Sequence, residues 1–342
     1  MKNINLFAVK RPIIDTSLFT NVLHDPIVTE VENRFAKLVG AKYAVSANSA
    51  SMLIYIYFKH VVDTPTPRVL LPGCYPPVVV SYLLHANAKV TLDWQMPDTW
   101  VGNEHKLYVH PHEGFTLIDS AQAIGANVYS RSLNRSGFPE DCMLFSFYPT
   151  KPCGGLDGGM LVTDSKEVAD EVRRYINYGH AVSGAQDSWS KEWDVPGYKA
   201  YMSATQALAI NLRLDSLEQE LKRLDVIRFK YQDSLLYSKI KVHPGSFSSN
   251  HLFRVKTNIP KCSISMFREE LRAKGIPTGI HYNPLTTVLS YEFLTKINTG
   301  DQNLLRRKFP TDKTEWISIP FHSELADSEV DYILRTMKCL EQ

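Results

Sequence analysis

A strand-like apolar segment that ends in a glycine-rich turn with one lysine is the most restrictive feature of this sequence. The segment from Cys142 to Tyr148 predicts a strand, and the turn after it carries Lys151 and four glycines between Gly154 and Gly159. A lysine at a strand end beside such flexible backbone can be held against a ligand. The ordinary alternative is a solvated lysine on a surface loop. The segment upstream favours the ligand-binding interpretation.

That upstream segment, FTLIDSAQAIGA from Phe115 to Ala126, predicts a second buried strand that ends in Asp119. Burying an unpaired carboxylate is costly, so an acid at this position is expected to have a partner. Open α/β sheets bind ligands at the carboxyl ends of their strands, and Asp119 and Lys151 both follow strand ends. Pyridoxal phosphate needs a lysine to form a Schiff base and an acid facing its pyridinium nitrogen. The pair therefore predicts a pyridoxal-phosphate site.

The two segments also resemble a known family. The pattern Asp119-x-x-Gln122, then Ser146 and Lys151 in SFYPTK, then the glycine-rich turn is similar to the DegT/DnrJ/EryC sugar aminotransferases, and the resemblance extends from about Val31 to Leu340. It implies a fold-type-I pyridoxal-phosphate enzyme and a homodimer whose active sites borrow residues from the partner. The implied substrates are an amino donor, with glutamate expected, and a keto-sugar attached to a nucleotide. Surface-polysaccharide or secondary-metabolite biosynthesis is the implied setting.

Residues near the first predicted strand are candidates for binding the cofactor phosphate. A strand, a small-residue turn and a helix start place free backbone amides where an anion can bind, although ordinary capping by Asn48 or Ser49 gives the same pattern. By the resemblance, Asn48-Ser49-Ala50 replaces the family's Gly-Thr-Ala, so Ser49 and Ala50 are implied to bind the phosphate. Ser146 is implied to join them there.

The resemblance assigns four further positions. Gln122 is implied to lie near the phenolic oxygen of the cofactor. The family stacks an aromatic residue on the pyridine ring, and the count from Pro72 reaches Pro76, so Tyr75 is the stacking candidate, with packing in the core as the alternative. Lys199 stands where the family has an asparagine that reaches the partner's cofactor phosphate, and a lysine can bind phosphate as a point charge. Within GIPTGIHYNPL, His281 matches the family's substrate-side histidine.

Two departures from the family pattern accompany these matches. Tyr201 replaces the family's arginine after Lys199, and the longer N-terminal glycine/tryptophan segment that touches substrate in many members is not found. Both concern substrate choice more than the cofactor.

Strand and helix patterns alternate through the first half of the chain, which predicts an α/β fold with a mainly parallel, seven-stranded type of sheet. A long helical pattern from Ser203 to about Ser238 then leads to mixed elements. We expect a large cofactor-binding domain over residues 1–238 and a small α+β domain over residues 239–342. The predicted strands of the large domain are Lys42–Ser46, Val69–Pro72, Ala88–Asp93, Lys106–His110, the strand ending at Asp119, Cys142–Tyr148 and Met160–Thr163.

Composition narrows the class of protein. The net charge is +2, from 38 basic and 36 acidic residues without a long basic run, which argues against nucleic acid as the main partner. No apolar run approaches the roughly 20 residues of a membrane span, and none resembles a signal peptide. Five cysteines without a close pair favour reduced thiols in the cytoplasm and no metal site.

Three alternatives remain. A pyridoxal-phosphate sugar dehydratase of the same fold would carry histidine in place of the lysine, so Lys151 favours amino transfer. A catalytically silent relative that binds a sugar or cofactor for regulation is consistent with the departures at Pro76, Lys199 and Tyr201. A P-loop or dinucleotide enzyme is disfavoured, because the glycines match neither the Gly-x-x-x-x-Gly-Lys-Ser/Thr spacing of a P-loop nor the Gly-x-Gly-x-x-Gly spacing of a dinucleotide-binding turn.

Overall fold

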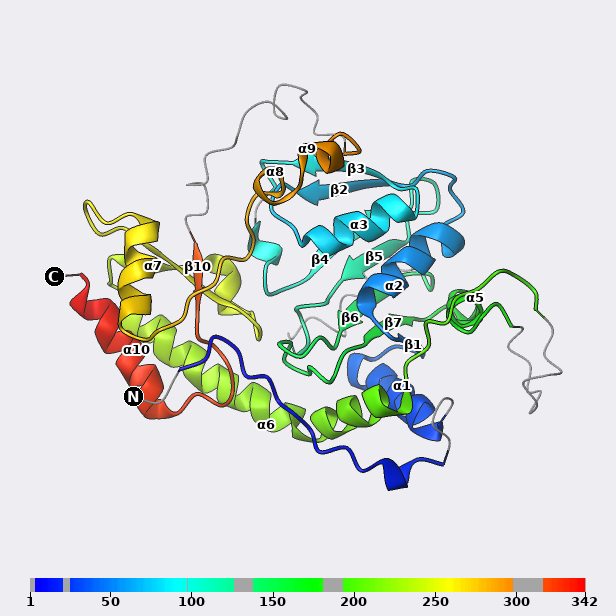
Figure 1. Cartoon of the computed structure of the whole chain (residues 1–342), viewed down its shortest axis with the longest axis horizontal. Helices are drawn as coiled ribbons and strands as arrows, with labels where there is room; N and C mark the ends of the chain where they lie inside the picture. Colours follow the sequence, from blue (N-terminus) through cyan, green and yellow to red (C-terminus); the bar gives the residue numbers. More distant parts are fainter. Residues whose placement is uncertain are drawn as a thin grey trace.

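The core of the structure is a sheet with helices on both faces (Figure 1). The computed structural model describes residues 4–20, 25–96, 98–125, 138–180, 193–297 and 316–341. Five strands pair in the order β1-β7-β6-β5-β4, and β2 pairs in parallel with β3 and contacts β4. Their bounds are β1 Tyr43–Ala47, β2 Arg68–Pro72, β3 Lys89–Asp93, β4 His105–Val109, β5 Thr116–Asp119, β6 Cys142–Ser146 and β7 Gly159–Thr163.

Both faces of this sheet are buried, which explains why β6 and β7 consist mainly of apolar residues. Neighbouring residues of β6 enter different cores: Leu144 packs with α2 and α3, whereas Phe145 packs with α1 and α6. The covering helices are α1 Pro26–Val39, α2 Ala50–Ile56 with its continuation η2 Tyr57–Val61, α3 Pro77–His85, α5 Lys166–Ile176 and α6 Ala204–Leu235.

Local sequence signals fix the ends of these helices. Asp25 caps α1 by accepting a hydrogen bond from the Ile27 amide, and Gly40 ends it in the left-handed conformation at φ 73°. Ser203 and Gln206 form a reciprocal capping box at the start of α6. The long helix therefore begins where the sequence predicts.

The predicted α/β fold and its seven strands are confirmed, but the prediction of a mainly parallel sheet is wrong. Within the five-stranded sheet only β5 and β6 pair in parallel, and the other three pairings are antiparallel. Residues 110–115 alone connect β4 to β5, and a parallel pair needs a crossover of a dozen or more residues. The connection is too short for a crossover helix, so β4 returns as an antiparallel hairpin.

A smaller antiparallel sheet in the order β10-β9-β8 follows α6. Its strands pack with α7, α10 and the second half of α6 around a separate hydrophobic core. Strand β8 and the short helices α8 and α9 were not predicted. The bounds are β8 Ile240–Val242, β9 Phe253–Thr257, α7 Ile264–Ala273, α8 Leu285–Val288, α9 Tyr291–Leu294, β10 Ile317–Ile319 and α10 Asp327–Cys339; the 3₁₀ turns are η1 Thr16–Leu18, η3 Asp98–Trp100 and η4 Pro244–Phe247.

The N-terminal segment before α1 lies along α6 and connects the two sheets (Figure 1). The backbone oxygen of Asn5 lies 3.0 Å from Nε2 of His322, and Nζ of Lys10 lies 2.5 Å from a carboxylate oxygen of Glu220. The described part of this segment thus has long-range anchors, although η1 is its only regular element.

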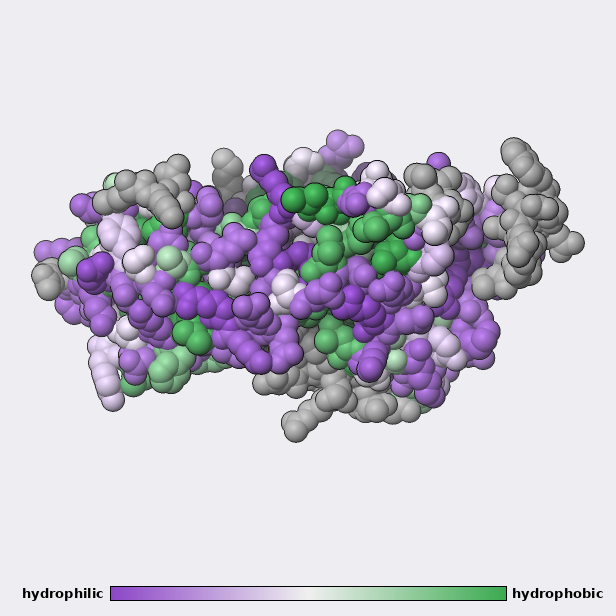
Figure 2. Space-filling view, turned by 90° about the horizontal axis from the view of Figure 1, so that it is seen from below, coloured by the Kyte–Doolittle hydropathy of each residue, from purple (hydrophilic) through white to green (hydrophobic). Residues whose placement is uncertain are grey.

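Seen from below the view of Figure 1, the surface of the molecule is largely polar, with apolar side chains gathered in a patch to the right of centre (Figure 2).

No helix in the described part of the chain is long and apolar enough to cross a membrane.

Candidate active site

Three strand ends bring the predicted residues to one edge of the central sheet. Asp119, the last residue of β5, is in register with Leu144 of β6. Ser146 ends β6 opposite Gly159, and Ala47 of β1 pairs with the other side of Gly159. The ends of β1, β5 and β6, which carry or precede Ser49, Asp119 and Lys151, therefore lie at one edge of the sheet, with β7 between β1 and β6.

The turn that carries Lys151 is tightly held. The Lys151 amide donates to the Tyr148 carbonyl at 2.9 Å, and the Gly154 amide donates to the Lys151 carbonyl at 2.8 Å. A Cβ added at Gly154 would lie 2.6 Å from the Tyr148 oxygen, so the turn requires glycine there. From α6, Nη2 of Arg213 donates to the Pro152 carbonyl at 2.8 Å. The lysine backbone is thereby fixed from both sides.

The amine of Lys151 lies in an environment that favours its neutral form. Burial lowers the pKa of Lys151 to about 8, and the nearby carboxylate of Asp119 acts in the opposite direction. Within the described residues its Nζ makes no hydrogen bond and no ion pair. An amine without a partner and with a lowered pKa is suited to react with an aldehyde.

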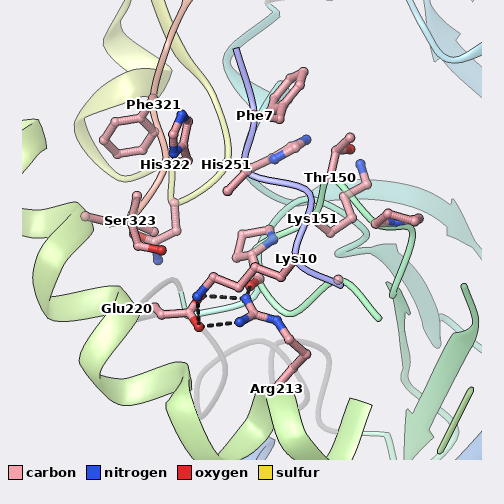
Figure 3. Close-up of a pocket in the computed structure, with 16 residues that line it drawn as sticks. Phe7, Lys10, Thr150, Lys151, Arg213, Glu220, His251, Phe321, His322 and Ser323 are labelled. Atoms are coloured by element: carbon pink, nitrogen blue, oxygen red, sulfur yellow. Dashed lines mark hydrogen bonds and ion pairs between the residues drawn. The ribbon is translucent and has the colours of Figure 1, made fainter. Parts of the chain in front are cut away.

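The imidazole ring of His251 lies on the same side of the pocket as this amine (Figure 3), and a second imidazole, that of His281, also responds to the charge of the amine. Burial, followed by the charge of Lys151, lowers the pKa of His251 well below its usual value and that of His281 to about 4. The ring of Phe7 stacks on His251 at 5.3 Å and meets His281 edge-on at 5.8 Å. Nδ1 of His281 lies 2.9 Å from Oγ of Ser318. The predicted His281 is thus at the site, and His251 and Phe7 are additions to it.

Asp119 has two hydrogen-bond donors. Its Oδ1 accepts from the Ala121 amide at 3.0 Å, and its Oδ2 accepts from the Tyr75 hydroxyl at 2.7 Å. Tyr75 is fully buried, and its ring packs on Trp100 at 4.4 Å and on His105 at 5.3 Å. No face of the Tyr75 ring is exposed, so the predicted stacking on a ligand would require the ring to move.

Gln122 is held by two elements. Its Oε1 accepts from the Gly102 amide at 2.7 Å, and its Nε2 donates to the Tyr282 hydroxyl at 2.8 Å. The Tyr282 ring lies parallel to that of Trp100 at 5.9 Å. Gln122 therefore joins the loop after β5 to the segment that contains His281.

The start of α2 forms the other end of the site. Ser49 caps the helix through the Met52 amide at 3.2 Å, and Asn48 donates its amide to the Ala200 carbonyl at 2.7 Å. A Cβ at Gly159 would lie 2.4 Å from the Ala50 nitrogen, so glycine allows β7 to approach the helix start closely. The exposed Lys199 precedes Ala200 and is therefore adjacent in sequence to a residue that contacts this turn.

The residues present fit pyridoxal phosphate. The amine of Lys151 and the carboxylate of Asp119 lie close enough for the carboxylate to affect the lysine pKa. A helix start with serine and a glycine-made cradle provide amide and hydroxyl donors for a phosphate.

The comparisons with known proteins point to an aminotransferase family. A model of the DegT/DnrJ/EryC1/StrS aminotransferase family matches residues 102–338. The chain is 24% identical to the spore coat polysaccharide biosynthesis protein SpsC of Bacillus subtilis over 92% of this chain and 89% of that protein.

Two solved structures share the fold. Spr1654 from Streptococcus pneumoniae in its PMP form has a TM-score of 0.80, 20% identity, and coverage of 99% of this chain and 98% of that one. Helicobacter pylori PseC, an aminotransferase involved in the biosynthesis of pseudoaminic acid, has a TM-score of 0.74 and 15% identity, with coverage of 97% and 98%.

The fold, the site and these comparisons define a pyridoxal-phosphate-dependent aminotransferase of fold type I. More specifically, the chain belongs to the DegT/DnrJ/EryC1/StrS aminotransferase family.

Proposed function

We propose that this chain transfers an amino group from an amino acid, with glutamate as the first candidate, to a keto-sugar linked to a nucleotide. One observation carries the proposal. The amine of Lys151, whose pKa is lowered, lies near the buried carboxylate of Asp119. The similarity to SpsC supports a sugar acceptor and a role in polysaccharide biosynthesis.

Each residue of the site has a distinct part in this proposal. Pyridoxal phosphate, when bound, supplies an aldehyde and an electron-accepting ring. Lys151 would hold the cofactor and, once released by the donor, would remove the proton at the donor's α-carbon as a general base. Asp119 would stabilise a positive charge on the ring nitrogen, because an opposite charge nearby favours the protonated form. Gln122 would orient the ring through its phenolic oxygen.

The phosphate would bind at the start of α2. Gly159 at the start of β7 pairs with Ser146 on one side and with Ala47 on the other, and it lies against the start of α2 at Ser49 and Ala50, which supports this assignment. We further propose that Lys199 contacts the phosphate of a partner subunit's cofactor in a homodimer. Its exposed side chain is consistent with such an interface.

On the substrate side, Phe7, His251 and His281 would form the wall that faces the acceptor. The two imidazoles have lowered pKa values, so both are neutral near pH 7 and can form hydrogen bonds with sugar hydroxyls. His281 would do so through Nε2, because its Nδ1 is engaged with Ser318. His281 keeps the substrate role predicted from its segment.

We also propose two domains, 1–238 and 239–342. The first half of α6 packs in the core with α1, and the second half packs in the core with α7 and α10, which supports a division along this helix. Three residues of the second range pack in the core of the larger domain: Leu285, Leu294 and Ile297. The segment that contains them would therefore pack on the first domain. Five cysteines without a disulfide support a cytoplasmic location.

The function can be tested with candidate keto-sugar nucleotides and ¹⁵N-glutamate. Transfer of ¹⁵N to the sugar with release of 2-oxoglutarate is the expected result. Loss of water without nitrogen transfer would instead assign a dehydratase, and a protein that stays colourless with added pyridoxal phosphate would be a silent relative. Lys151→Ala should abolish turnover, and Asp119→Ala should lower it severely, whereas Lys166→Ala, at an exposed lysine, serves as the control.

A further inference from the structure

Tyr75 occupies a position in the active site that differs from the stacking predicted for it. Two backbone hydrogen bonds hold the start of the turn Gly73–Pro77. The Gly73 amide donates to the Asp93 carbonyl at 3.0 Å, and the Leu285 amide donates to the Gly73 carbonyl at 2.9 Å. A Cβ at Gly73 would lie 2.1 Å from the Trp94 ring, so the turn packs closely there. Held in this way, the turn directs Tyr75 inward.

The contact it makes is with the acid of the site. The Tyr75 hydroxyl donates to Oδ2 of Asp119 at 2.7 Å, and both side chains are buried, with exposed fractions of 0% and 8%. A hydrogen bond to a carboxylate in such surroundings is stronger than one in water. Oδ2 is therefore engaged by Tyr75 before any ligand binds, while Oδ1 accepts from the Ala121 amide.

We propose that Tyr75 is a positioning residue that acts on the cofactor through Asp119. By sharing the carboxylate, its hydroxyl fixes the plane of the acid together with the Ala121 amide. It also reduces the negative charge available to the pyridine nitrogen, so it weakens the hold of the site on the ring proton. This inference rests on the proposed function, since it assigns Asp119 to the ring nitrogen.

Other groups also act on Asp119, and the proposal accounts for them. His105 of β4 is in register with Asp119, is buried, and has an Nε2 without a partner among the described residues. Lys151 comes from the turn after β6, and Tyr282 from the segment after α7; Asp119 influences the pKa of each. Of these neighbours, Tyr75 alone has a hydrogen bond to the carboxylate within the described residues.

The alternative is that Tyr75 is an ordinary core tyrosine whose hydroxyl needs an acceptor. Tyr231 provides the matched control, because it is also fully buried and donates to the Pro320 carbonyl at 2.9 Å, outside the site. Tyr231→Phe removes the same hydroxyl without touching Asp119.

The test is the ¹⁵N NMR spectrum of bound pyridoxal phosphate labelled at the ring nitrogen, followed against pH. Tyr75→Phe should raise the midpoint of ring-nitrogen titration by about one pH unit, the size expected for one hydrogen bond to a charged group. Tyr231→Phe should leave the midpoint unchanged. In an Asp119→Asn background, Tyr75→Phe should have no further effect. An unchanged midpoint in Tyr75→Phe, or an equal change without the carboxylate, would overturn the proposal.

A second measurement uses the protein without cofactor and separates this inference from the function. In protein labelled with ¹³Cζ-tyrosine, the Tyr75 signal, identified by its loss in Tyr75→Phe, should move in Asp119→Asn while the Tyr231 signal stays. An unmoved Tyr75 signal rejects the contact and with it the inference. A wild-type protein that binds no pyridoxal phosphate would reject the proposed function, whatever this spectrum gives.

Discussion

The lowered pKa of Lys151 can be measured before any cofactor is added. Burial takes this pKa from its ordinary 10.5 to about 8 against the opposing effect of Asp119. At pH 7 a lysine with a pKa of 8 is neutral about 10% of the time, compared with about 0.03% for one of 10.5. Because only the neutral amine is nucleophilic, Lys151 should react roughly 300-fold faster than its ordinary pKa would allow, at equal access.

The assay is trace acetylation of the unloaded protein across pH 6–11, with each lysine quantified by mass spectrometry. Lys166 is the internal reference, because it is exposed and its hydrogen bond with Asp170 raises its pKa. The reactivity of Lys151 should rise with a midpoint near pH 8, whereas that of Lys166 should rise above pH 10. If both lysines titrate together, the electrostatic argument for Lys151 is refuted.

Two further predictions concern the elements that support the site. Glu220→Gln leaves the buried Arg213 and the half-buried Lys10 without their acid and should lower the free energy of unfolding, measured in urea titrations, by about 3–5 kcal/mol. Glu218→Gln, at an exposed pair, should leave the free energy of unfolding unchanged. Burial opposes ionisation of Glu220, but hydrogen bonds from Arg213, Lys10 and Ser216 lower its pKa, so this contribution is present above pH 4.5 and is lost as pH falls through the lowered value. Gly159→Ala places a Cβ 2.4 Å from the Ala50 nitrogen and should lower stability by about 1–3 kcal/mol. It should also weaken binding of pyridoxal phosphate more than binding of pyridoxal, measured by absorbance; an equal loss for both would remove the phosphate from this turn.

The sequence predicts the elements of this fold well, because each has a local cause. Strands buried on both faces appear as apolar runs, and caps such as Asp25 and Ser203 mark helix starts. The antiparallel direction of β4 was missed although the sequence carries a signal for it: the connection between β4 and β5 is too short for the crossover that a parallel pair needs. Strand β8 has only three residues, too few for a periodic signal.

The residues of the candidate site also fall into those with a local sequence signal and those without one. Lys151 and Asp119 were predicted from their positions at strand ends, and Ser146 from the family resemblance. His251 and Phe7 were missed, since each reaches the site by tertiary packing from a segment without a distinctive pattern. Tyr282 lies beside the predicted His281, but its bond to Gln122 joins residues 160 positions apart. The contact of Tyr75 with Asp119 likewise depends on how a turn packs.

The covalent bond between Lys151 and the cofactor is the most direct test of the whole account. The protein is loaded with pyridoxal phosphate, reduced with borohydride, digested and analysed by mass spectrometry. The account predicts a single phosphopyridoxyl group on Lys151 and its loss in Lys151→Ala. A modification on any other lysine, or none at all in a protein that turns yellow, would contradict it.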